Sequence, residues 1–80
     1  FRKEHAILMM ADSVEAGSKS LKNPTHESLC ELVDEIIDHQ KKRGQFDNVP
    51  ITLKEITQCK EVFKKMLASI YHIRIEYPKQ

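Results

Sequence analysis

The stretch from Leu29 to Gly44, LCELVDEIIDHQKKRG, decides the fold class of this 80-residue chain. Its acidic residues occupy one helix face, and basic residues crowd the last turn before Gly44, which is a natural helix stop. With Thr25 as the N-cap, the stretch predicts a helix over residues 25–43. The apolar residues recur at i, i+3, i+4, i+7 and i+8, the spacing of a single helix face: Leu29, Leu32, Val33, Ile36 and Ile37.

Two further segments predict helices on either side of this one. The first covers residues 2–20, where apolar side chains surround most of the circumference, so we expect it to be buried on several sides. The second covers residues 52–76, where Thr52 and Glu55 form a capping box and Pro78 follows the end. No segment alternates with period two. The sequence therefore predicts an all-α fold of three helices without a sheet.

Composition excludes several classes of function. The chain carries 13 Lys and Arg residues against 12 Asp and Glu residues, a formal charge of +1, which gives no electrostatic case for a nucleic-acid polymer as partner. No apolar run approaches the roughly 18 residues of a membrane span. Cys30 and Cys59 have neither redox-motif nor zinc-finger spacing, so we expect two reduced, half-buried thiols.

Asp12 interrupts the apolar run Leu8 to Ala16, LMMADSVEA. Residues three and four positions away share its helix face, and Leu8, Met9 and Ala16 among them are apolar. We therefore expect Asp12 to lie within or at the edge of a buried surface, where a carboxylate needs a partner. A salt bridge to a lysine, a cap on another helix and a bound metal all satisfy that need, and the pattern alone favours the first two.

Other polar residues carry weaker signals. His5 lies two helical turns before Asp12, and we expect it at the helix surface. The run SKSLK, residues 18–22, offers hydroxyl and ammonium groups to a phosphate, although a solvated helix end has the same composition. His72 and Glu76 are spaced for a local ion pair. No glycine-rich phosphate loop, GxSxG or HExxH motif occurs.

Four segments, in order, resemble the C-terminal end of the HD-superfamily phosphohydrolase domain of bacterial seven-transmembrane HD proteins. They cover nearly the whole chain, and they read AILMMADSVEAGSKSLKNPT (6–25), LVDEIID (32–38), GQFDNVPITLKEI (44–56) and IYHIRIEYP (70–78). The resemblance implies a membrane-anchored, all-α enzyme with a binuclear site for Mn or Fe, which hydrolyses cyclic di-AMP to pApA. It also implies a location at the cytoplasmic face of the bacterial inner membrane.

The same resemblance assigns roles to individual residues. Asp12 matches the last metal-ligand aspartate of the family, and Lys19 stands where an arginine is usual, which weakens any role in binding substrate. The His-Asp pair and the other ligands of the family are absent from residues 1–80. We therefore expect a C-terminal fragment that binds no metal and is inactive alone, with the upstream remainder of the HD domain and a cyclic dinucleotide as partners.

A second hypothesis is a stand-alone three-helix interaction module, whose apolar stripes bind a partner helix. Under either hypothesis the apolar helix over residues 2–20 leaves part of its surface uncovered, and such a patch favours a homo-oligomer.

Overall fold

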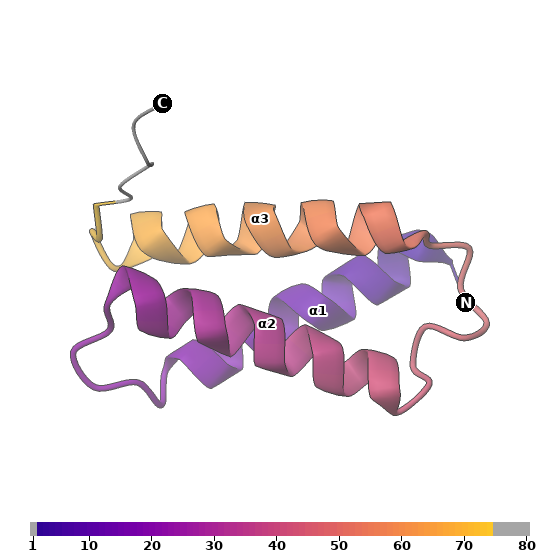
Figure 1. Ribbon diagram of the computed structural model, residues 1–80, viewed down its shortest axis with the longest axis horizontal. Coiled ribbons are helices and arrows are strands. Elements are labelled where there is room, and N and C mark those ends of the chain that lie inside the picture. The colour runs from indigo at the N-terminus through magenta and orange to yellow at the C-terminus, as the bar shows by residue number, and fades with distance from the viewer. Residues whose placement is uncertain (1, 75–80) are drawn as a thin grey trace.

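The computed structural model describes residues 2–74 and contains three α-helices: α1 (Lys3–Ser18), α2 (His26–Lys42) and α3 (Leu53–Ile70). In Figure 1, α3 and α2 lie toward the viewer, and α1 crosses behind α2. Every pair of helices is in contact. No strand occurs within residues 2–74, so the prediction of an all-α, three-helix fold is confirmed.

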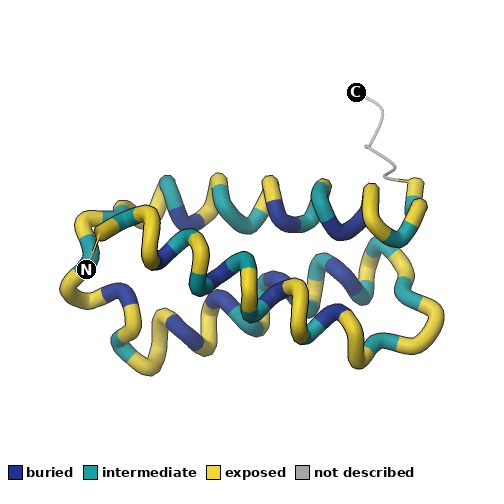
Figure 2. Tube along the Cα trace, turned by 180° about the vertical axis from the view of Figure 1, so that it is seen from behind, coloured by how far each residue is buried: buried dark blue, intermediate teal, exposed yellow. Residues whose placement is uncertain are grey.

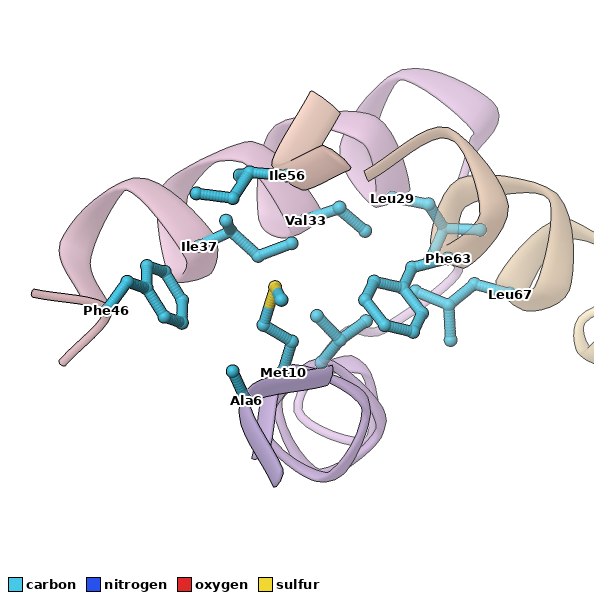
Figure 3. Close-up of a cluster of buried hydrophobic side chains, with 10 residues drawn as sticks. Ala6, Met10, Leu29, Val33, Ile37, Phe46, Ile56, Phe63 and Leu67 are labelled. Atoms are coloured by element: carbon cyan, nitrogen blue, oxygen red, sulfur yellow. The ribbon is translucent and has the colours of Figure 1, made fainter. Parts of the chain in front are cut away.

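The core forms where the three helices face one another. In Figure 2 the buried positions of each helix point inward, and in Figure 3 Met10 of α1 projects between residues of α2 and α3. Phe46, in the loop between α2 and α3, is only 8% exposed and covers one end of this cluster. The other buried apolar side chains are Ala6, Val14, Leu29, Val33, Ile37, Ile56, Phe63, Leu67 and Ala68.

Local hydrogen bonds set the helix starts as the sequence predicted. The Thr25 hydroxyl accepts from the Ser28 amide at 3.0 Å, and the Ser28 hydroxyl also bonds the Thr25 amide at 2.8 Å. The predicted capping box of Thr52 and Glu55 is present, with both of its bonds at 3.1 Å. These side chains satisfy amides that the first turn of a helix leaves without partners.

The ends of α2 and α3 share one geometry. Gly44 has a φ of 74°, and the amides of residues 44 and 45 bond back to carbonyls of residues 41 and 40, which is a Schellman motif. His72 has a φ of 56° in the matching position after α3, where the amides of residues 72 and 73 bond back to residues 69 and 68. The predicted stop at Gly44 is confirmed.

The predicted extent of the third helix is wrong at residues 71–74, which are not helical. The Ser18 hydroxyl donates to the Glu15 carbonyl at 2.7 Å, so the Tyr71 hydroxyl, 3.0 Å away, is the donor of the bond between them. Ile73 packs against the core. These contacts with the rest of the fold favour a turn at residues 71 and 72 over further helix. Residues 75 and 76, and with them the expected His72–Glu76 pair, lie outside the described residues.

The expectation that the first helix is buried on several sides is also wrong. Helix α1 is buried along one face only, and Leu8 is 58% exposed. The helix ends at Ser18, two residues before the approximate end expected, and residues 19 and 20 form a turn. Gly17 faces α2 near this end, and a Cβ at that position would lie 2.7 Å from Ile36 Cδ1. Gly17 therefore permits a close approach between α1 and α2.

Ion pairs join the helices at their edges. Lys3 at the start of α1 pairs with Glu55 at the start of α3, and this hydrogen bond raises the pKa of Lys3 and lowers that of Glu55. Between α2 and α3, Lys60 Nζ lies 2.7 Å from an Asp38 oxygen, which lowers the pKa of that carboxyl group. Each pair links two helices at the surface of the bundle.

We expect His72→Gly to raise the free energy of unfolding by about 0.5–1 kcal/mol, because glycine adopts a positive φ without the steric cost that histidine bears. Urea denaturation of the two proteins measures the difference. His39→Gly is the matched control, since His39 is exposed inside α2, where glycine should cost about 0.3–0.5 kcal/mol relative to histidine. A destabilised His72→Gly protein would contradict the left-handed turn.

We expect Lys3→Met to lower the free energy of unfolding at neutral pH. The folded-state pKa of Glu55 lies below its ordinary value of 4.5, so its stabilising contribution is present above that pH and is lost as the pH falls through the lowered pKa. Lys3, with a pKa raised above 10.5, loses its contribution only as the pH rises through that raised value.

Urea denaturation from pH 3 to pH 9 measures this effect. The difference between Lys3→Met and the wild type should be constant near neutral pH and should shrink as the pH falls below 4.5 and through the lowered pKa of Glu55. Lys65→Met, which removes an exposed lysine of α3, should show no such pH dependence. A Lys3→Met difference that persists undiminished at pH 3 would exclude the ion pair as its cause.

Candidate functional site

The outer face of α1 carries the residue with the strongest functional signal, Asp12. The buried residues of α1 recur every four positions, and Asp12 lies two positions from both Met10 and Val14, about 200° around the helix. The expectation that Asp12 lies within or at the edge of a buried surface is therefore wrong for this chain. We call the exposed residues beside it the outer face of α1: His5, Leu8, Asp12, Glu15, Ala16 and Lys19.

Asp12 has no partner within the part of the chain that the structure describes, residues 2–74: no hydrogen bond or ion pair to it occurs there. Within these residues, Asp12 therefore makes neither the salt bridge nor the helix cap that the sequence pattern favours. Lys19 lies on the same face with its side chain 72% exposed, and its Nζ lies 3.9 Å from a Glu15 oxygen. This exposed pair contributes little to stability.

Within residues 2–74, no group of three or more histidine, cysteine or acidic side chains could hold a metal ion. His5 is exposed, as predicted, and it does not complete a site with Asp12. The described residues therefore do not fit a binuclear metal site by themselves. A lone solvent-facing carboxylate can supply one ligand to a site whose other ligands come from elsewhere.

The two cysteines are free and half-buried, as predicted. Burial raises the pKa of the Cys30 thiol, and its sulfur lies 3.4 Å from His26 Nε2. Burial also raises the pKa of Cys59. A raised thiol pKa disfavours the reactive thiolate, so neither cysteine has the environment of an activated nucleophile.

Two cavities open along the side of α1 next to the outer face, one toward the loop after α2 and the other toward α2 itself. One, of about 850 Å³, lies between the start of α1 and the loop after α2, with Arg2, His5 and Asn48 in its lining. The other, of about 600 Å³, lies further along α1 and includes Ser13 and Gln40. Met9 lines both, and it precedes Asp12 by three residues on α1.

Gln40 is the residue of this region that the sequence interpretation missed. It is 7% exposed, and its Nε2 donates to the Ser13 hydroxyl at 2.8 Å. The helical spacing of Gln40 indicates its burial, because it follows Ile36 by four residues and Ile37 by three and so continues the apolar face of α2.

Comparison with known proteins identifies the relatives of this fold. No protein-family model matches the chain. The chain is 42% identical over 77 residues to the cyclic-di-AMP phosphodiesterase PgpH of Bacillus subtilis, and 41% identical over 76 residues to PgpH of Listeria monocytogenes. The crystal structure of the L. monocytogenes PgpH HD domain in complex with cyclic di-AMP matches it with a TM-score of 0.86 and 39% identity. The chain is homologous to the PgpH HD domain.

Each match covers nearly all of this chain but only a small part of the relative. The match takes in 96% of this chain and 11% of the B. subtilis PgpH sequence, and 95% of this chain and 36% of the crystallised PgpH HD domain. A second structure of that HD domain matches with a TM-score of 0.84 over 89% of this chain. The three helices thus correspond to about a third of a PgpH HD domain. Within residues 2–74, no helix is long and apolar enough to cross a membrane.

We expect Asp12→Asn to change the free energy of unfolding by less than about 0.5 kcal/mol, because the side chain is exposed and has no partner among the described residues. Met10→Ala, which empties the centre of the core, should cost about 2–5 kcal/mol. Urea denaturation of the three proteins measures both changes. A loss above 1 kcal/mol in Asp12→Asn would show that the carboxylate stabilises the fold.

Proposed function

We propose that the chain is the C-terminal portion of an HD-type, metal-dependent phosphohydrolase that converts cyclic di-AMP to pApA, and that Asp12 supplies one of its metal ligands. The observation that carries this proposal is the match, at a TM-score of 0.86 and 39% identity, to an HD domain crystallised with cyclic di-AMP. The position of Asp12 supports it, since this carboxylate faces outward without a partner among the described residues.

The remainder of the HD domain supplies the other ligands in this proposal. It covers the outer face of α1, where Leu8 and Ala16 are apolar residues exposed on either side of Asp12. Burial of Leu8 would favour that association, and it would place Asp12 in a water-poor environment where a metal compensates its charge. When bound, a pair of Mn or Fe ions would neutralise charge on the phosphoryl oxygens and activate the attacking water.

Lys19 is the substrate-binding residue of the proposal. It extends from the outer face of α1, seven residues after Asp12, which is about 10 Å along the helix. Its weak pair with Glu15 leaves the ammonium group available to a phosphate, to which it would offer a point charge rather than the two-pronged contact of an arginine.

Membrane anchoring also belongs to the proposal. The whole protein would hold this domain at the cytoplasmic face of the bacterial inner membrane through segments outside residues 1–80, and the chain alone would be inactive because it holds only one ligand.

A second function rests on a different observation. Within residues 2–74, four large apolar side chains are more than half exposed: Leu8, Leu53, Val62 and Ile70. A cavity of about 300 Å³ between α1 and α3 includes Ile7, Val62 and Phe63 in its lining. If no HD remainder covers these residues, the chain is a three-helix interaction module or self-associates through them.

In a protein with the complete HD domain, we expect Asp12→Asn to lower the turnover of cyclic di-AMP by at least about 100-fold and to reduce bound metal, because even second-shell changes cost 10–100-fold at metal sites. Turnover with Mn²⁺ and metal content by mass spectrometry are the two measurements. Glu15→Gln is the matched control, since it neutralises an exposed carboxylate on the same helix face.

Near-wild-type turnover in Asp12→Asn would contradict the ligand role. The 80-residue chain, assayed alone with Mn²⁺, should show no turnover, and measurable turnover by the chain alone would contradict the need for ligands from outside it.

A further inference from the structure

The charges of this nearly neutral chain are unevenly distributed, and one end of the bundle is basic. Residues 2–5 and 41–55 include six lysine and arginine residues against three acidic ones, whereas the other described residues have an acidic excess. These two segments contain the start of α1, the end of α2, the loop that follows and the start of α3, and we call them the basic end. The small net charge of the chain therefore hides a local positive surface.

Contacts between the segments show that they lie together. Lys3 of α1 pairs with Glu55 of α3, and one cavity is lined both by Arg2 and by residues 44 and 45 of the loop after α2. In Figure 1 the start of α1, the end of α2 and the start of α3 lie at the same end of the bundle. Basic residues from distant parts of the sequence are therefore neighbours in the fold.

Most cations of the basic end have no acidic partner. The nearest acidic residue of α2, Asp38, already accepts a hydrogen bond from Lys60 at 2.7 Å. Within residues 2–74, five exposed side chains of the basic end are in no ion pair: Arg2, Lys41, Lys42, Arg43 and Lys54.

The helix dipole explains only part of this arrangement. The C-terminal end of α2 favours the positive charges of Lys41, Lys42 and Arg43. Arg2, however, is the N-cap of α1, and Lys54 lies in the first turn of α3, where the positive end of each dipole repels a cation. These two residues are unfavourable for the helices that carry them, and an anionic partner would offset that effect.

Exposed apolar surface accompanies the cations. Leu53, the first residue of α3, is 65% exposed, and Pro50 in the loop before it is also exposed. The basic end has one aromatic side chain, Phe46, and it is buried. Proteins bind single-stranded nucleic acids by stacking bases on exposed aromatic side chains, whereas lipid interfaces accept apolar side chains flanked by lysine and arginine. This composition favours a lipid surface over a nucleic acid.

We propose that the basic end docks on an anionic lipid surface. Leu53 enters the boundary between headgroups and acyl chains, and the five unpaired cations lie over the headgroup phosphates. Each lysine or arginine near an anionic bilayer strengthens binding about fivefold, so the contact is reversible and weakens with salt. The inference goes beyond the proposed function, because it needs neither a metal nor the remainder of an HD domain.

The test is cosedimentation of the 80-residue chain with lipid vesicles at about 0.1 M salt, where the Debye length is about 10 Å. Vesicles of equal parts phosphatidylglycerol and phosphatidylcholine should bind the chain, and vesicles of phosphatidylcholine alone should not. Lys41→Gln combined with Lys42→Gln should lower the partition coefficient about 10- to 30-fold. Leu53→Gln should lower it about 3- to 10-fold, because it removes the apolar contact.

Each variant has a matched control. Lys22→Gln combined with Lys65→Gln removes two exposed lysines from outside the basic end and makes the same change in net charge. Val62→Gln replaces an apolar side chain that is 60% exposed further along α3. Circular dichroism checks that every variant is folded. Equal losses in the test and control variants would overturn the inference, since net charge and overall hydrophobicity would then govern binding.

Three other results would also overturn it. Equal binding to vesicles of phosphatidylcholine alone would exclude recognition of anionic headgroups. Tighter binding to a single-stranded RNA oligonucleotide than to the anionic vesicles would make the basic end a nucleic-acid surface. Vesicle binding by the 80-residue chain but not by a soluble protein with the complete HD domain would show that the rest of the domain covers the basic end. The assay contains no metal or cyclic dinucleotide, so its failure and the failure of the proposed reaction are distinguishable.

Discussion

Helix α1 can bury only one side of itself, and this limit shapes the whole molecule. Ala6, Met10, Val14 and Ser18 recur every four residues, and all four face α2 and α3. Met10 is fully buried at the centre of the shared core, so a rotation of α1 that covered Leu8 would expose it. Burying an apolar side chain of that size is worth about 1.5–3 kcal/mol, a large share of the stability of so small a domain. The orientation of α1 therefore turns Asp12 outward.

The parts of the fold that depend on local sequence could be predicted, and those that depend on tertiary contacts could not. Helix α2 has one apolar face and one charged face, so its helical period can be predicted from the sequence. Its two ends can be predicted from the capping residues Thr25 and Gly44. Helix α1 has apolar residues on both faces, so periodicity cannot say which face is buried. The turn that ends α3 is accompanied by a hydrogen bond between Tyr71 and Ser18, residues 53 apart in the chain, which local sequence does not reveal.

The candidate site could be predicted only in part for the same reason. Asp12 stands out in the sequence because of its apolar neighbours, but those neighbours do not show that it is buried: Leu8 and Ala16 are exposed in this chain. In the proposed function, the remainder of an HD domain would cover these two apolar neighbours together with Asp12.

Asp12 and Gln40 Oε1 both lack a hydrogen-bond partner among the described residues, but Asp12 is exposed and Gln40 is buried. Asp12 is exposed, so water solvates its carboxylate and the chain bears no cost for leaving it without a partner. Gln40 Oε1 is buried without a hydrogen-bond partner among the described residues, which costs about 1–3 kcal/mol. The other end of the same amide offsets part of that cost, because Nε2 donates to the Ser13 hydroxyl at 2.8 Å and so joins α2 to α1.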